Sequence, residues 1–411
     1  MSLSRRQFCQ WLGATGAGAA QAFGSASAAA QPLAGAAEID SHIGNLYPFV
    51  QKQADRSALE LSFLRAESPD LERWQNGARA KVFEHLFYAP PPVSPSAELI
   101  RRTDNGDYVL EYLTFQTTPD LRVPAYVLIP KNAKLPAPGM VVLHDHGGFY
   151  AWGKEKVVEV DDEPEALGAF KQEYYDGASI ATELVRQGYV VIAIDMFYWG
   201  ERRMLLADDP PAYRDREQMT AEDMTAFHRR SQQSEQLVAR SLLTAGITWP
   251  GVILWDDIRT LDYLASRPEV DAQRLGCAGL SVGGYRSFLL AALDRRIKVA
   301  VDVGWMTSYA SQISRHVVNT VGLTFHIPGL YRYLDLPDLA ALIAPRAALV
   351  INGSRDRLFA PSGVEAAFTK IEQCYRKAGA RDRQRCRLYD APHQFNAAMQ
   401  AEAWEWIRRW V

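Results

Sequence analysis

The sequence predicts an α/β fold, in which a mostly parallel central sheet is covered by helices on both faces. Two observations lead to this prediction: short apolar runs of the buried-strand type, and helical segments that separate those runs. Strands that alternate with helices imply a parallel sheet. A hydrophobic content of 48% over 411 residues suits its large core. The apolar runs are 140–143, 189–194, 275–278, 299–303 and 347–351, and the helical segments are 174–187, 252–266, 284–293 and 363–378.

The chain before this alternating region has a different pattern. Residues 57–87 carry apolar side chains at three- and four-residue spacing, which predicts a helix that ends before the prolines at 90–92. Residues 108–117 and 122–130 alternate in polarity around a Thr-Pro-Asp turn, so we expect an antiparallel hairpin. At the far end, residues 387–389 predict a last short strand, followed by a final helix with an apolar stripe.

Three connections are too long to be plain crossovers: residues 144–174, 197–249 and 305–339. The second is expected to contain a long helix of its own, at about residues 217–243. All three leave the carboxyl ends of strands, where ligands bind in open α/β sheets. Loops of this length usually carry function or form lids, so we expect them to wall the pocket as cap-forming insertions.

The strongest chemical signal is Gly279-Leu280-Ser281-Val282-Gly283, which stands between an apolar run and a small-residue helix. This is the G-x-S-x-G pattern of a sharp strand-to-helix turn that exposes a serine hydroxyl. Glycines on either side let the strand and helix backbones approach each other. The sequence predicts Ser281 as nucleophile, with the N–H of Val282 at the start of the helix as one donor to an oxyanion.

A serine nucleophile needs a base, and the base needs an acid that orients it. His393 follows the last strand and precedes the last helix, which is where the chain order Ser, Asp, His places the base. Asp356, in the polar turn after the strand 347–351, is the predicted acid. Its rival is Asp302, at the end of the previous strand, and the structural alternative for Asp356 is a salt bridge to a neighbouring arginine.

The second oxyanion donor is expected from the loop that reads His144-Asp145-His146-Gly147-Gly148-Phe149. Its glycines allow the backbone to close on a substrate oxygen, and the donor is the N–H of either His146 or Gly147. The two histidines could instead be a metal pair, but no cluster with ligand spacing accompanies them. We therefore expect no metal and no other cofactor.

Further pocket residues are expected from the same strand ends. They are Phe149, Trp199, Glu201 and Trp305, with His316 and His326 as additional positions. Packing, or for Glu201 an ion pair that anchors the long insertion, is the alternative for each of them.

The N-terminus reads as a targeting signal. Ser4-Arg5-Arg6-Gln7-Phe8 is a twin-arginine signature, and a Gly/Ala stretch with small residues suited to cleavage follows it. We expect residues 1–30 to be a signal peptide, residues 31–107 an N-terminal helical cap segment, and residues 108–411 the catalytic domain of a periplasmic or secreted protein. In such a compartment Cys374 and Cys386 could pair across an αβ loop. A net charge of −3 gives no reason to expect nucleic acid or an anionic membrane as a partner.

With these motifs located, the chain resembles α/β-hydrolases of the dienelactone-hydrolase and acetyl-xylan-esterase-like group of bacterial proteins. The resemblance covers about residues 108–411 and is carried by residues 143–148, Trp255-Asp256-Asp257, residues 279–284 and Pro392-His393. It implies the α/β-hydrolase fold, with Ser281, Asp356 and His393 as nucleophile, acid and base. The chain departs from the group in two respects. Dienelactone hydrolases use a cysteine where this chain has Ser281, and the Arg-Gly-Gln signature of esterases active on acetylated sugars and cephalosporins is missing.

The function expected from the sequence is therefore a serine hydrolase that cleaves a small-molecule or carbohydrate ester through an acyl-enzyme. A prolyl-oligopeptidase-like peptidase is one alternative, because Gly-x-Ser-x-Gly-Gly-Tyr also fits that group, although no propeller repeat precedes the sheet. A non-catalytic binding protein on the same scaffold is the other alternative.

Overall fold

The structure is a computed structural model that describes residues 41–65, 70–313 and 322–411. Residues 40–411 belong to one compact unit. The signal peptide expected at residues 1–30 lies outside the described residues, and so does His316.

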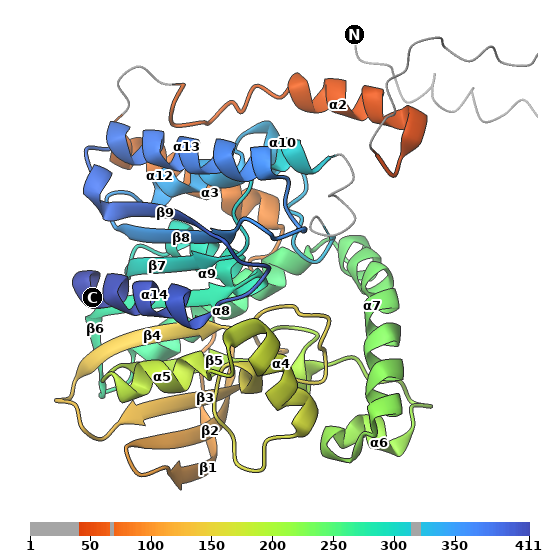
Figure 1. The fold of residues 1–411 in the computed structure, drawn as a ribbon, viewed down its shortest axis with the longest axis vertical. Helices are drawn as coiled ribbons and strands as arrows, with labels where there is room; N and C mark the ends of the chain where they lie inside the picture. Colours follow the sequence, from red (N-terminus) through yellow and green to blue (C-terminus); the bar gives the residue numbers. More distant parts are fainter. Residues whose placement is uncertain (1–40, 66–69, 314–321) are drawn as a thin grey trace, which may run out of the picture. The chain divides into compact units, whose positions relative to one another are not determined.

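A nine-stranded sheet forms the centre of the described chain, in the order β1-β2-β3-β5-β4-β6-β7-β8-β9 (Figure 1). The pairs β1–β2, β2–β3 and β3–β5 are antiparallel. The remaining neighbouring pairs, from β5–β4 to β8–β9, are parallel. The expectation of a mostly parallel α/β sheet is confirmed. The strands are β1 (Glu98–Asp104), β2 (Tyr108–Gln116), β3 (Arg122–Pro130), β4 (Ala137–Leu143), β5 (Val190–Ile194), β6 (Val270–Leu280), β7 (Ile297–Val303), β8 (Ala347–Gly353) and β9 (Gln384–Tyr389).

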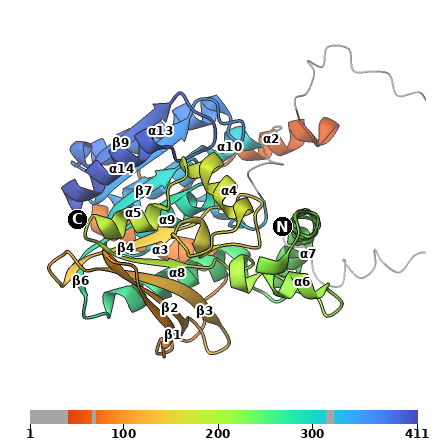
Figure 2. The same cartoon turned by 60° about the horizontal axis from the view of Figure 1, so that its bottom comes forward.

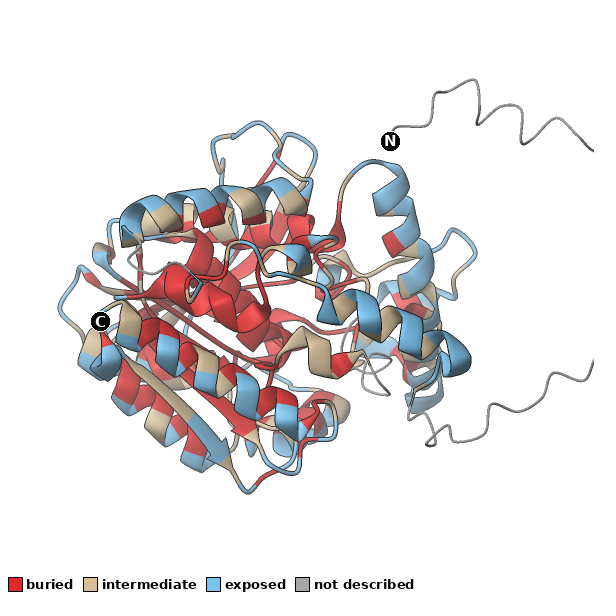
Figure 3. Ribbon diagram, turned by 90° about the horizontal axis from the view of Figure 1, so that it is seen from above, coloured by how far each residue is buried: buried red, intermediate tan, exposed pale blue. Residues whose placement is uncertain are grey.

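Helices cover both faces of the sheet, which is why its central strands are buried on both sides. One hydrophobic core packs α3 (Leu71–Leu86), α8 (Trp249–Ala265), α9 (Val282–Leu293), α12 (Ala340–Ile343) and α13 (Pro361–Lys377) on one face. A second core packs α5 (Ile180–Arg186) and α14 (Ala397–Trp410) on the other face. Every residue of α9 is buried, whereas the outer helices expose one side (Figure 3). The other α-helices among the described residues are α2 (Tyr47–Asp55), α4 (Glu165–Tyr175), α6 (Pro211–Arg214), α7 (Ala221–Thr244) and α10 (Tyr309–Gln312).

The parallel strands β4, β6, β7 and β8 are neighbours, so their carboxyl ends lie at one edge of the sheet. The loops that follow Leu143, Leu280, Val303 and Gly353 therefore meet there. The insertion after β5 supplies α6 and α7, which lie beside the sheet rather than on either face (Figures 1 and 2). The long helix expected in this insertion is thus observed, as α7.

Three expectations about elements differ from the structure. The single helix expected at 174–187 is two helices, because Asp176 and Gly177 have positive φ angles of 53° and 78° and end α4 before α5 begins. The helix expected at 57–87 begins only at Leu71, where the Asp70 side chain caps it. The segment 31–107 is also not wholly helical, since it contains β1, an exposed edge strand without the alternation that identifies a half-buried strand.

Cys374 and Cys386 are free thiols, so the pairing considered for them is not formed. Among the described residues, no single helix has the length and apolar character needed to cross a membrane. The helices α7 and α8 meet that requirement only together, with a bend of 83° between them.

Candidate active site

Ser281 occupies the turn between β6 and α9 with φ = 58° and ψ = −124°, a conformation that a residue with a side chain rarely adopts. Such strain costs about 1–3 kcal/mol and is found where the surrounding structure fixes the backbone. The turn is fixed here by a hydrogen bond of 2.6 Å from Ser281 N to the carbonyl of Val303. A Cβ on Gly279 or Gly283 would collide with the carbonyl oxygen of Leu143, so both glycines are required by close packing.

His393 and Asp356 come together from the loops after β9 and β8. The Nδ1 atom of His393 lies 2.6 Å from Oδ2 of Asp356, and Oδ1 of Asp356 accepts the N–H of Leu358 at 2.9 Å. Because Asp356 can only accept when ionised, Nδ1 of His393 is the donor and Nε2 is left with a lone pair. The neighbouring Arg355 forms an ion pair with Asp390, so the alternative of a local salt bridge to Asp356 does not hold for it.

Ser281 and His393 line the same cavity, which has a volume of about 420 Å³. Ser281 is only 5% exposed, so a substrate has to enter this cavity to reach its hydroxyl. A larger cavity of about 710 Å³ lies at the amino end of β4 and contains neither residue. The smaller cavity is therefore the candidate active site. Its lining residues are His146, Gly147, Gly148, Tyr174, Gln232, Glu235, Ser281, Val282, Trp305, Gly322, Phe325, Leu358 and His393.

The loop after β4 is held in place by hydrogen bonds to one of its backbone carbonyl groups, that of His146. The carbonyl oxygen of His146 accepts hydrogen bonds from Lys156 Nζ at 3.0 Å, Trp199 Nε1 at 3.1 Å and Phe149 N at 3.3 Å. In a planar trans peptide the following N–H, that of Gly147, points opposite to this carbonyl. Gly147 has φ = 56°, and a Cβ there would stand 2.5 Å from both the Asp145 carboxylate and the Phe170 ring. The N–H of Gly147 is thus fixed in direction at the cavity wall.

The two histidines of this loop do not form a metal pair. His144 is fully buried, its Nδ1 donates to the carbonyl of Asp145 at 2.8 Å, and its Nε2 accepts the N–H of Met196 at 3.0 Å. Burial lowers the pKa of His144 well below its usual value, so it remains neutral. His146 accepts the N–H of Gly148 through Nδ1 and donates through Nε2 to Glu235 at 2.7 Å. Neither ring has a nitrogen without a hydrogen-bond partner.

Asp302, the alternative candidate for the catalytic acid, is not hydrogen-bonded to His393. It is fully buried in β7, facing the first turn of α9, where a Cβ on Gly284 would collide with it. Neither carboxylate oxygen has a hydrogen-bond partner among the described residues. Burial raises the pKa of Asp302 to about 8. His393 instead pairs with Asp356.

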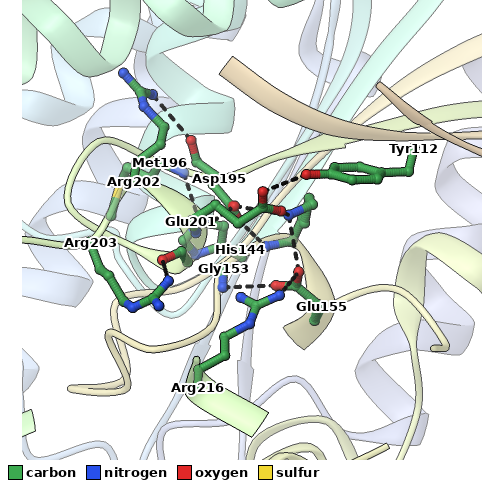
Figure 4. Close-up of polar contacts among 12 residues, drawn as sticks. Tyr112, His144, Gly153, Glu155, Asp195, Met196, Glu201, Arg202, Arg203 and Arg216 are labelled. Atoms are coloured by element: carbon green, nitrogen blue, oxygen red, sulfur yellow. Dashed lines mark hydrogen bonds and ion pairs between the residues drawn. The ribbon is translucent and has the colours of Figure 1, made fainter. Parts of the chain in front are cut away.

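An ionic cluster joins the buried carboxylates of Glu155 and Asp195 to the exposed carboxylate of Glu201 (Figure 4). The ammonium of Lys154 contacts the carboxylates of Glu155 at 3.0 Å, Asp195 at 2.9 Å and Glu201, and Arg216 adds an ion pair to Glu155 at 2.6 Å. Burial alone would lower the pKa of Lys154, but the three carboxylates outweigh it and raise that pKa well above its usual value. The three carboxylates are the only group of potential metal ligands among the described residues, and the Lys154 ammonium contacts every one of them.

Three residues expected in the pocket have other positions. Glu201 faces Lys154 and the hydroxyl of Tyr112, and so anchors the insertion through an ion pair. Trp199 is fully buried behind the His146 ring, and Phe149 stacks between Trp152 and Phe170. Of the four residues expected in the pocket, only Trp305 lines the cavity. His326 does not line the cavity, whereas its neighbour Phe325 does.

The contribution of α7 to the cavity was not predicted from the sequence. Gln232 and Glu235 reach the cavity from this helix, and Tyr174 reaches it from α4. A Gln and a Glu three residues apart share one helix face, but nothing in the sequence states where that face points. Asp256 and Asp257 of α8 also proved structural, because Asp257 holds Arg286 of α9 through two hydrogen bonds of 2.6 and 3.0 Å and Asp256 pairs with Arg202 at 2.8 Å.

Comparison with known proteins shows which family this chain belongs to. The chain belongs to the Abhydrolase family, whose model matches residues 46–400. A curated relative, "Putative hydrolase YtaP" of Bacillus subtilis, is 28% identical over 339 residues, which span 81% of this chain and 98% of the relative. Among solved structures, a "putative acetyl xylan esterase" from Bacteroides fragilis is similar with a TM-score of 0.66 at 22% identity, covering 84% of this chain and 81% of that one. A glucuronoyl esterase from Teredinibacter turnerae gives a TM-score of 0.56 at 17% identity, covering 87% and 90%. These likenesses show a shared fold.

Proposed function

We propose that this protein is a serine esterase that hydrolyses carboxylic esters through an acyl-enzyme, with Ser281, His393 and Asp356 as its catalytic residues. The observation that carries the proposal is the meeting of two independent features in one cavity. One is a serine on a strained strand-to-helix turn, and the other is a histidine whose Nδ1 is hydrogen-bonded to a buried carboxylate. Serine hydrolases need both features, because the hydroxyl is a weak nucleophile without an oriented base.

The proposed reaction follows from these positions. Oγ of Ser281 attacks the ester carbonyl carbon while Nε2 of His393 takes its proton, and Asp356 stabilises the imidazolium through Nδ1–H. The tetrahedral intermediate then collapses, and the alcohol leaves with the proton from His393. Water attacks the acyl-enzyme in the same way, with His393 again accepting and returning one proton, which releases the acid and restores Ser281.

The negative oxygen of each intermediate needs donors that are already in place. We assign these to the N–H groups of Val282 and Gly147. Val282 is the first residue of α9, where the N–H has no partner within the helix. Gly147 is favoured over His146 because the three donors on the His146 carbonyl turn the Gly147 N–H to the opposite side. Each such donor contributes about 3–4 kcal/mol of transition-state stabilisation.

An ester of a carbohydrate is the proposed substrate class. The similar structures named above as an acetyl xylan esterase and a glucuronoyl esterase support it, as does a cavity of a size typical of small-ligand sites. We also propose that the protein is exported by the twin-arginine route, on the basis of Arg5 and Arg6. Replacing both arginines by lysine should retain the protein in the cytoplasm, and export of that variant would contradict the proposal.

Labelling and turnover test the catalytic proposal together. The purified protein should hydrolyse 4-nitrophenyl acetate and be labelled once by a fluorophosphonate, at the peptide that contains Ser281. The Ser281→Ala variant should lose both properties, while Ser287→Ala, a neighbouring serine of α9 that bonds the carbonyl of Gly283, should keep the label. Hydrolysis of aminoacyl-proline amides without hydrolysis of esters would favour the peptidase alternative.

A further inference from the structure

The wall of the cavity that α7 forms has polar groups that the catalytic steps do not use. Gln232 and Glu235 lie three residues apart on α7, on the same helix face, and both line the cavity that contains Ser281. We infer that this pair is a binding subsite for the hydroxyl groups of a neutral polyol, such as a sugar, that forms the alcohol part of the ester. The inference rests on the proposed function and adds to it a residue-level basis for substrate choice.

The hydrogen bonds of Glu235 leave one of its oxygens available. Oε1 of Glu235 accepts two hydrogen bonds, from His146 Nε2 at 2.7 Å and from the hydroxyl of Tyr150 at 2.8 Å. Oε2 has no hydrogen bond to any described residue. Since His146 and Tyr150 fix the carboxylate in place, Oε2 is a preorganised acceptor on the cavity wall, and little side-chain entropy is lost when a ligand binds it.

Gln232 adds the complementary groups. Gln232 is an exposed residue that lines the cavity, and its side chain makes no hydrogen bond to another described residue. A primary amide offers both an acceptor oxygen and two N–H donors, whereas a carboxylate only accepts. A hydroxyl group is itself a donor and an acceptor, so two neighbouring hydroxyls match an amide beside a carboxylate. A cationic group would use Glu235 alone and would gain nothing from the amide N–H donors.

The charge of the lining favours a neutral or cationic alcohol over an anionic one. None of the described residues that line the cavity is a lysine or an arginine, and the fixed charge among them is that of Glu235. A carboxylate-bearing sugar would place its charge close to Glu235 in a partly enclosed space, where the repulsion is only weakly screened. Aromatic side chains of Trp305 and Phe325, which pack edge to face at 5.3 Å between ring centroids, supply an apolar surface in the same cavity.

The test compares three acetate esters that differ only in the alcohol: a methyl xyloside monoacetate, acetylcholine and 4-nitrophenyl acetate. The quantity measured is the kcat/KM for each ester divided by that for 4-nitrophenyl acetate, because this ratio cancels any general effect on catalysis through His146. For Gln232→Ala we expect the xyloside ratio to fall about 3- to 10-fold, the loss of one neutral hydrogen bond. For Glu235→Gln we expect a fall of about tenfold, since an amide oxygen replaces a charged acceptor.

Glu222→Gln is the matched control, because Glu222 is an exposed residue of the first turn of α7 and does not line the cavity. It should leave the xyloside ratio unchanged. Unchanged xyloside ratios in both Gln232→Ala and Glu235→Gln would overturn the subsite while leaving the esterase intact. Acetylcholine as the best ester, with a ratio that collapses in Glu235→Gln, would replace the hydroxyl site by a cation site. A wild-type protein that hydrolyses none of the three esters would instead refute the proposed function itself.

Discussion

Replacing Asp302 by asparagine should change how the stability of the protein depends on pH. Asp302 is fully buried in β7, and neither carboxylate oxygen has a hydrogen-bond partner among the described residues. Burial raises its pKa from 3.8 to about 8, with no opposite charge to compensate. Between pH 4 and pH 8, the folded protein therefore holds a proton on Asp302 that the unfolded chain has released.

The sign follows from proton binding in the two states. Where the folded state holds the extra proton, the free energy of unfolding falls as pH rises, by about 1.4 kcal/mol per pH unit. The stabilising contribution of protonated Asp302 is complete below pH 4, is lost as pH rises towards 8, and changes no further above that value. Asparagine has nearly the same shape and does not titrate. From pH 5 to pH 7 the Asp302→Asn variant should therefore gain about 2.7 kcal/mol in stability relative to the wild type.

Urea unfolding at pH 5, 6, 7 and 8 measures this difference, because all other titrating groups are shared by the two proteins and cancel. A constant difference over this range would show that Asp302 is ionised in the folded protein and would refute the reasoning. The same variant also separates the two candidate acids, since His393 is hydrogen-bonded to Asp356 and not to Asp302, so replacing Asp302 should leave kcat within a few-fold of the wild type.

Three further substitutions test the site. Asp356→Asn should lower kcat about 10³- to 10⁴-fold without unfolding the protein, because an amide presents the wrong partner to the histidine; a kcat near the wild-type value would remove Asp356 from the mechanism. Lys156→Met should lower kcat by up to about 10²-fold with little change in KM, since the His146 carbonyl loses a donor, and an unchanged kcat would show that this lysine does not orient the loop. Gly147→Ala should lower both kcat and the melting temperature, because its Cβ would meet the Phe170 ring at a positive φ; a variant with wild-type values for both would refute the close fit.

The parts of the site that the sequence predicts well are those determined by local geometry or by chain order. The turn at Ser281 follows from the glycine spacing between an apolar run and a helical segment, because a Cβ at Gly279 or Gly283 would collide with the neighbouring strand. His393 and Asp356 follow from their positions after successive strands, since parallel strands bring their carboxyl ends to one edge. The strands β4 to β8 were predicted because each contains a continuous apolar run, whereas β9, which is largely polar, was predicted only at residues 387–389.

The parts that could not be predicted depend on where a side chain points. Trp199 and Glu201 do follow a strand end, and the alternatives of packing for Trp199 and an ion pair for Glu201 hold. The partner of Glu201 could not be named from the sequence, because the Lys154 ammonium lies 47 residues earlier in the chain. Glu235 lies 89 residues from His146 in sequence, and only the packing of α7 beside the sheet brings the two together. The edge strand β1 was missed because both of its faces are exposed, so it lacks the periodicity on which a strand prediction depends.

The arrangement separates the groups proposed for catalysis from those proposed for substrate choice. The loop with the Gly147 N–H is fixed from behind by Lys156 and Trp199, both fully buried, so its geometry does not depend on the occupant of the cavity. The helix α7 meets this loop through Glu235, and most of its other side chains are exposed or half-buried. Substitutions on the cavity face of α7 can therefore alter the fit of the alcohol while the oxyanion donors stay in place. Substitutions behind the loop change the chemistry for every ester, and this difference in substrate dependence distinguishes the two groups experimentally.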